Sequence, residues 1–207
     1  MTNLEALLGA ALDKATTKLY RAKTIHLRYN LSLEHKEFLT RQAVLTIYAC
    51  WEGFLKESLS LYLQSLNTKS LTYDELHPNY LAYQTDHICT FKSSKTNFTT
   101  ISKLSHQIFH TYKNNVVFHT KINTESNANL KVTNSLLQKL LIPTISNDYE
   151  HDLNKLLLFR NSVAHGDDSI TITQADINYF SILTQNLMSE LVTSISEVDR
   201  QSIYRKL

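Results

Sequence analysis

Glycine, proline and cysteine are all scarce in this chain of 207 residues, which contains three glycines, two prolines and two cysteines. Turn-rich β architectures generally need many more glycines and prolines to reverse direction, so their scarcity favours long helices. The two cysteines, Cys50 and Cys89, have no C-x-x-C spacing and are too few for a disulfide scaffold. We therefore expect reduced thiols in a cytoplasmic protein.

Long apolar runs and a strong net charge are also missing. No stretch approaches the ~20 apolar residues of a transmembrane helix, and charged residues such as Asp13 and Lys14 interrupt the N-terminal region, unlike a signal peptide. We expect a soluble protein with no membrane partner. The net charge of +2 does not by itself indicate a nucleic-acid-binding protein, so any basic surface must be local.

Apolar residues recur at steps of three and four over most of the chain, which predicts amphipathic helices. The longest span about residues 3–29, 32–66 and 173–195, and shorter ones span about 133–142 and 148–165. Ser32 suits the start of the second helix, Asp148 suits the start of another, and Thr173 with Asp176 resembles a capping box. Gly53 inside the second helix suggests that another backbone packs closely there. The fold class is therefore all-α, an up-and-down helical bundle.

Residues 67–130 differ in texture from the rest, because Asn, Thr, Ser, Lys and His dominate. Pro78 interrupts the early part, and only Phe98 to Tyr112 has helical periodicity, whose spacing favours a core role for its apolar residues. We interpret 67–130 as a polar insertion within one domain covering 1–207. Residues 91–131 hold six lysines and one acid, Glu125, interleaved with aromatic residues, a mixture that can bind phosphates and stack bases. The candidate RNA-binding residues are Lys92, Lys95, Lys103 and Lys113.

One short segment, R-N-S-V-A-H-G at residues 160–166, combines side chains suited to chemistry at a phosphate. A guanidinium such as that of Arg160 matches phosphate geometry, and an imidazole such as that of His165 can accept or return a proton near neutral pH. Asn161 shares a helix face with His165 and could hydrogen-bond its ring. Arg160 lies about 140° around an ideal helix from His165, so the two converge only if the last turn distorts or two copies meet. An alternative is that both cations simply cap the helix C-terminus.

Two motifs resemble those of a known family. R-N-S-V-A-H-G resembles the R-x4-6-H motif of HEPN-domain nucleases, and A-C-W-E-G-F-L-K-E at residues 49–57 is similar to a W-E-x-F pattern in stand-alone prokaryotic HEPN proteins of toxin and defence systems. The resemblance implies a four- or five-helix bundle that forms a homodimer, with both sets of Arg160 and His165 lining one cleft at the two-fold axis; Asn161 is the third candidate catalytic residue. It implies no modification like that of the subgroup with a tyrosine two residues after the histidine, because Asp167 stands there.

The implied activity is that of an endoribonuclease that needs no metal or other cofactor. It would cleave RNA by attack of the 2′-hydroxyl, leave 2′,3′-cyclic phosphate and 5′-hydroxyl ends, and serve as a toxin or phage-defence effector restrained by an antitoxin or another regulatory protein. The alternative is a catalytically inactive HEPN-like module that binds RNA or protein. His106 and His110 are four residues apart but lack a third ligand at a matching interval, so we do not expect a metal site there.

Overall fold

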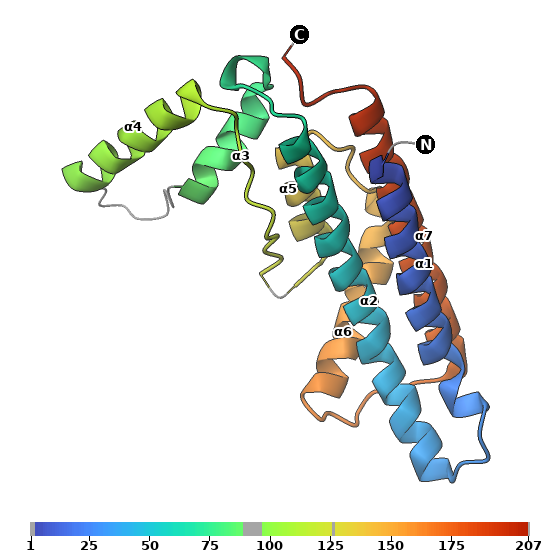
Figure 1. The fold of residues 1–207 in the computed structure, drawn as a ribbon. Helices are drawn as coiled ribbons and strands as arrows, with labels where there is room; N and C mark the ends of the chain where they lie inside the picture. Colours follow the sequence, from blue (N-terminus) through green and yellow to red (C-terminus); the bar gives the residue numbers. More distant parts are fainter. Residues whose placement is uncertain (1–2, 89–96, 126, 207) are drawn as a thin grey trace.

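The computed structural model describes residues 3–88, 97–125 and 127–206, and this part of the chain is built from α-helices (Figure 1). No strand occurs among these residues, and the one isolated β-bridge joins Leu76 to Arg205. The expected all-α bundle is therefore confirmed. The α-helices are α1 (Asn3–Thr24), α2 (Leu33–Thr68), α3 (Pro78–Ile88), α4 (Phe98–Lys113), α5 (Leu130–Lys139), α6 (Glu150–Ala164) and α7 (Gln174–Arg200).

Helix α2 forms the centre of the bundle. It contacts α1, α6 and α7, and α1 also contacts α7, so the three longest helices pack side by side along their length (Figure 1). Trp51, Leu55 and Leu59 of α2 are completely buried, as are Phe180 and Leu187 of α7. This apolar core is what holds α6 and its C-terminal end in place.

Local hydrogen bonds at the helix starts agree in part with the expected caps. The Ser32 hydroxyl accepts from the His35 backbone N–H at the start of α2. At the start of α7, Thr173 and Asp176 form the predicted capping box. The expectation for Asp148 was wrong, because its backbone N–H donates to the Ser146 side chain and a short 3-10 turn, Asn147–Tyr149, precedes α6.

Helix α3 is a helix that the sequence analysis missed. Pro78, interpreted above as a break, is its first residue, where a proline is well tolerated because the first helical N–H has no partner within the helix. Tyr80 of α3 is fully buried, and its hydroxyl lies 2.6 Å from that of Tyr62 on α2. This pair joins α3 to the central helix.

Helix α4 has the predicted extent but not the predicted burial. It extends away from α1 and α7 (Figure 1), and Phe98 and Ile101 are 83% and 47% exposed, with Tyr112 also exposed. The expectation that its apolar residues belong to the core was therefore wrong, since periodicity marks an apolar stripe without specifying what covers it. Whether 67–130 is an insertion stays a prediction.

Gly53 does not mark a close approach of another backbone. A Cβ atom added at Gly53 would meet no other atom within 4 Å. The interpretation of this glycine as a site of close packing was wrong, and Gly53 instead lines an open groove between α1 and α2 together with Ala11, Ala15 and Ala49. In the part of the chain that the structure describes, no helix is long and apolar enough to cross a membrane.

Candidate active site

The segment R-N-S-V-A-H-G forms the C-terminal end of α6 and the turn that closes it. Helix α6 ends at Ala164, and Gly166 adopts φ +70°, a left-handed conformation that glycine adopts without steric cost. The Gly166 N–H donates to the Val163 carbonyl (3.2 Å) and the Asp167 N–H to the Ser162 carbonyl (2.9 Å). These two bonds define a Schellman motif, which satisfies carbonyls that the helix end leaves unpaired.

A second helix fixes this turn from outside. The Arg41 side chain of α2 donates to the Asp167 carbonyl (2.6 Å) and pairs with the Asp168 carboxylate (3.1 Å). The Ser162 hydroxyl donates to the same Asp167 carbonyl (3.0 Å). The backbone N–H and the hydroxyl of Ser169 donate to the Asp167 carboxylate and lower its pKa. The turn is thus held by contacts that sequence reasoning did not identify, because Arg41 lies 126 residues before Asp167.

Arg160 is held through its guanidinium. The guanidinium carbon lies 4.8 Å from the centre of the Tyr48 ring, which is cation–π geometry, and its Nη1 donates to the Asn161 side-chain oxygen (2.8 Å). The expectation that the Asn161 amide bonds His165 is therefore not met, because that oxygen faces the neighbouring arginine. Among the described residues, Arg160 has no carboxylate partner.

His165 is the C-cap of α6 and its side chain is exposed. Its backbone N–H donates to the Asn161 carbonyl (3.0 Å), while its φ of −92° and ψ of 3° depart from helical values. None of the hydrogen bonds among the described residues joins its imidazole to Arg160. Because the His165 side chain is exposed, its imidazole is accessible to a bound molecule or a second copy.

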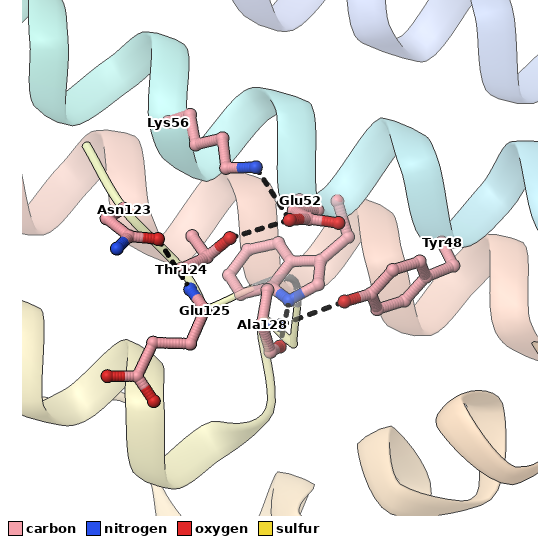
Figure 2. A network of polar contacts seen from close by, with 8 residues as sticks. Tyr48, Glu52, Lys56, Asn123, Thr124, Glu125 and Ala128 are labelled. Carbon is pink, nitrogen blue, oxygen red and sulfur yellow. Dashed lines mark hydrogen bonds and ion pairs between the residues drawn. The ribbon is translucent and has the colours of Figure 1, made fainter. Parts of the chain in front are cut away.

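Behind Arg160 lies a polar network that includes the residues of the W-E pattern (Figure 2). The Tyr48 hydroxyl accepts from the Ala128 N–H (2.9 Å), and the Trp51 indole donates to the Ala128 carbonyl (2.9 Å). The Glu52 carboxylate accepts from the Thr124 hydroxyl (2.6 Å) and the Lys56 ammonium (2.7 Å). In this chain the W-E pattern therefore fixes Thr124 and Ala128 against α2.

The ionisation of this network follows from its burial and hydrogen bonds. Burial raises the pKa of Tyr48 above its ordinary value of 10.0, so the hydroxyl is neutral. Burial also acts to raise the pKa of Glu52, but the hydrogen bonds from Lys56, Thr124 and Tyr48 outweigh it and leave the pKa below its ordinary value of 4.5. Glu52 is thus a carboxylate at neutral pH and a strong acceptor.

Two of the four candidate RNA-binding lysines belong to α4, and the other two fall outside the part of the chain that the structure describes. Lys92 and Lys95 lie outside the described residues, Lys103 is exposed on α4, and Lys113 is the last residue of that helix. Other lysines of the same stretch, Lys121 and Lys131, line a pocket of about 520 Å³ between α3 and α5. Their spacing in the sequence carried no signal of this, since the pocket depends on how the two helices pack.

No group of three or more His, Cys, Asp or Glu side chains that could hold a metal ion is found within the described ranges. Cys50 is buried and has a free thiol, and Cys89 lies outside those ranges. His106 and His110 are exposed on α4.

An all-helical bundle with an arginine, an asparagine and a histidine at the end of its penultimate helix defines a HEPN-type protein. A family model described as MAE_28990-like HEPN matches residues 4–202, so the chain belongs to this HEPN family. The resemblance seen in the sequence is thereby confirmed, and membership suggests a ribonuclease-like or nucleotide-binding function. No curated protein and no solved structure matched the chain.

Proposed function

We propose that this protein is a metal-independent endoribonuclease whose catalytic residues are Arg160, His165 and Asn161. The observation that carries the proposal is the arrangement of Arg160 and His165 at the C-terminal end of α6. There a guanidinium that pairs with no carboxylate of the described residues is held by Tyr48 and Asn161, five residues before an exposed imidazole. A guanidinium remains charged at every working pH, and an imidazole exchanges protons near neutrality.

The reaction uses the internal nucleophile of RNA. His165 removes the proton of a ribose 2′-hydroxyl, and the 2′-oxygen attacks the adjacent phosphorus while the bond from phosphorus to the 5′-oxygen breaks. The 5′-oxygen leaves as a hydroxyl after taking a proton from an imidazolium. Arg160 stabilises the negative charge that builds on the phosphoryl oxygens. The products are a 2′,3′-cyclic phosphate and a 5′-hydroxyl, and DNA is not a substrate because it lacks the 2′-hydroxyl.

We further propose that the active form is a homodimer in which the two α6 helices face one another. The exposed side of α6 presents an unpaired apolar side chain, Leu158, which is 58% exposed. His151, Asn154, Asn161 and His165 are also exposed and share its helix face, at the three- and four-residue spacing of a helix-pairing seam. Pairing along this face would bring two imidazoles into one groove, one to accept the 2′-hydroxyl proton and one to protonate the leaving oxygen.

The test is cleavage of single-stranded RNA by purified protein in EDTA. We expect Arg160→Ala and His165→Ala each to lower the rate by roughly 10²–10⁴-fold, the usual contribution of an acid–base or oxyanion-stabilising group. His106→Ala, an exposed histidine on α4 and outside the proposed pairing face, is the matched control and should cleave like the unmodified protein. RNA with a single 2′-deoxyribose at the cut site should resist cleavage there.

Cleavage that survives both Arg160→Ala and His165→Ala would refute the assignment. RNA binding without any cleavage would support the alternative of an inactive binding module instead.

The proposed role is that of a toxin or phage-defence effector in the cytoplasm, kept in check by an antitoxin or other regulatory protein. Support for this role comes from the HEPN membership. Expression of the chain should arrest growth, and expression of the His165→Ala form should not. Equal growth of both strains at equal protein levels would contradict this role.

A further inference from the structure

The position of Arg160 depends mainly on one side chain of another helix. Asn161, its hydrogen-bond partner, is exposed and adjacent in sequence, so solvent competes for that bond and it restrains little by itself. Tyr48 is only 2% exposed, and its ring lies 4.8 Å from the guanidinium carbon. A buried ring on the central helix is a rigid platform for the long, flexible arginine side chain.

The Tyr48 ring is itself fixed at its far end (Figure 2). Its hydroxyl accepts from the Ala128 N–H, and the Ala128 carbonyl accepts from the Trp51 indole, so this residue of the 124–128 segment is tied to α2 on both sides. The hydroxyl also interacts with the Glu52 carboxylate, which Lys56 and Thr124 bind in turn. The orientation of the ring is therefore determined by α2 and Ala128 together.

An aromatic partner leaves the arginine in a different state from a carboxylate partner. A salt bridge would neutralise the guanidinium and occupy its N–H groups, whereas a ring face attracts the cation and leaves donors in the guanidinium plane free. Among the residues that the structure describes, one such donor is used, by Asn161. The Glu52 carboxylate of this network pairs with Lys56 and accepts a hydrogen bond from Thr124 instead. The charge and the donors of Arg160 thus stay available for a phosphate.

We propose that Tyr48 is a positioning residue that holds the Arg160 guanidinium, charged and with donors free, in the orientation that meets the phosphoryl group undergoing cleavage. This inference rests on the proposed ribonuclease function. A ring that holds the cation in the productive geometry contributes to the chemical step more than to substrate binding, because it limits the conformations in which the arginine is wrongly placed.

The first test compares two substitutions in single-turnover RNA cleavage at saturating protein. Tyr48→Leu removes the ring and should lower the cleavage rate by about tenfold while changing the apparent RNA dissociation constant by less than about twofold. Tyr48→Phe keeps the ring and should cleave within about threefold of the unmodified protein. Tyr62→Leu is the matched control for lost packing, because Tyr62 is equally buried on α2 but contacts Tyr80 instead. Assayed well below its melting temperature, Tyr62→Leu should retain the full rate.

The second test does not depend on activity. Protons of an arginine side chain that lies over a ring face have NMR resonances shifted upfield by the ring current. The Arg160 side-chain resonances, assigned by their absence in Arg160→Lys, should be shifted upfield in the unmodified protein and in Tyr48→Phe, and should move to ordinary values in folded Tyr48→Leu.

The outcomes separate this inference from the function on which it rests. If the unmodified protein cleaves RNA and Tyr48→Leu cleaves equally fast, the positioning role is overturned and the ribonuclease assignment stands. An equal loss of rate in Tyr62→Leu would also overturn it, since general loosening of the core would then explain both. If the unmodified protein does not cleave RNA at all, the ribonuclease proposal fails along with any catalytic role for Tyr48. The ring-current shift then still reports whether Tyr48 holds the arginine.

Discussion

The end of α6 and the helix α4 differ in how firmly the rest of the protein holds them. The turn after α6 has a complete Schellman motif, two contacts from Arg41 and an arginine lying on the buried Tyr48 ring. Helix α4 carries the exposed Phe98 and Ile101, and its main contacts are to α3 and a short 3-10 turn, Tyr73–Glu75. The candidate chemistry therefore lies on the rigid region, as expected for a site whose groups must be positioned before substrate binds.

The largest expected effect tests whether the bundle and Ala128 form one rigid unit. Trp51→Ala removes a completely buried side chain and the indole bond to Ala128. We expect the free energy of unfolding to fall by about 3–5 kcal/mol, the usual cost of truncating a core aromatic. Urea denaturation followed by circular dichroism measures this. A loss of unfolding free energy below about 1 kcal/mol would contradict the statement that the bundle holds this region firmly.

The next largest effect is expected from a substitution in the turn that follows α6. Gly166→Ala places a Cβ atom on a residue at φ +70° and should lower the free energy of unfolding by about 1–2 kcal/mol. Gly53→Ala is the matched control with the opposite sign. It lies within α2, where the added Cβ meets nothing within 4 Å, and should stabilise the protein by about 0.5–1 kcal/mol. Thermal unfolding of both variants checks the pair, and a shift of the same sign in both would contradict it.

A smaller effect is expected on how the free energy of unfolding depends on pH through Glu52. The folded pKa of Glu52 lies below its ordinary value, so its ionised form stabilises the fold at pH above about 4.5, and this contribution is lost as pH falls through the lowered folded pKa. Glu52→Gln should cost about 1 kcal/mol at pH 7, and the difference from the unmodified protein should shrink below about pH 4.5. Urea titrations between pH 7 and pH 3 measure it. Glu57→Gln, on the same helix but exposed to solvent, should change stability little across the range.

The smallest expected effect is on α4. Phe98→Ala should change the free energy of unfolding by less than about 0.5 kcal/mol, because the ring is 83% exposed. Phe54→Ala, a buried phenylalanine of α2, is the control and should cost about 3–5 kcal/mol. Similar losses in the two variants would show that α4 is packed as firmly as the bundle and would remove the contrast.

Sequence patterns predicted where the helices lie in the chain better than which parts of the protein each helix packs against. The extents of α2 and α4, the start of α7 and the Thr173–Asp176 capping box were predicted, because they depend on residues a few positions apart. Helix α3 was missed since Pro78 was taken as a break and not as a first residue. The burial of α4 was wrong because an apolar stripe looks the same whether another helix covers it or not.

The candidate site likewise has features that could be predicted from the sequence and features that could not. The residue types of R-N-S-V-A-H-G and the glycine that ends α6 were evident along the chain, and so was the family to which they belong. The partner of Asn161 was not, because an amide four residues from one side chain and one residue from another could bond either.

By itself the sequence determined the features that depend on residues close together in the chain. These are the start of α2, the end of α6, the start of α7 and the apolar face of each helix. They also include the presence of Arg160 and His165 beside the glycine that ends α6. Only the tertiary structure decided that Tyr48 lies beneath the arginine and that Arg41 holds the turn. These contacts join helices far apart in the chain, and their geometry follows from how the buried faces of α2 and α6 pack against one another.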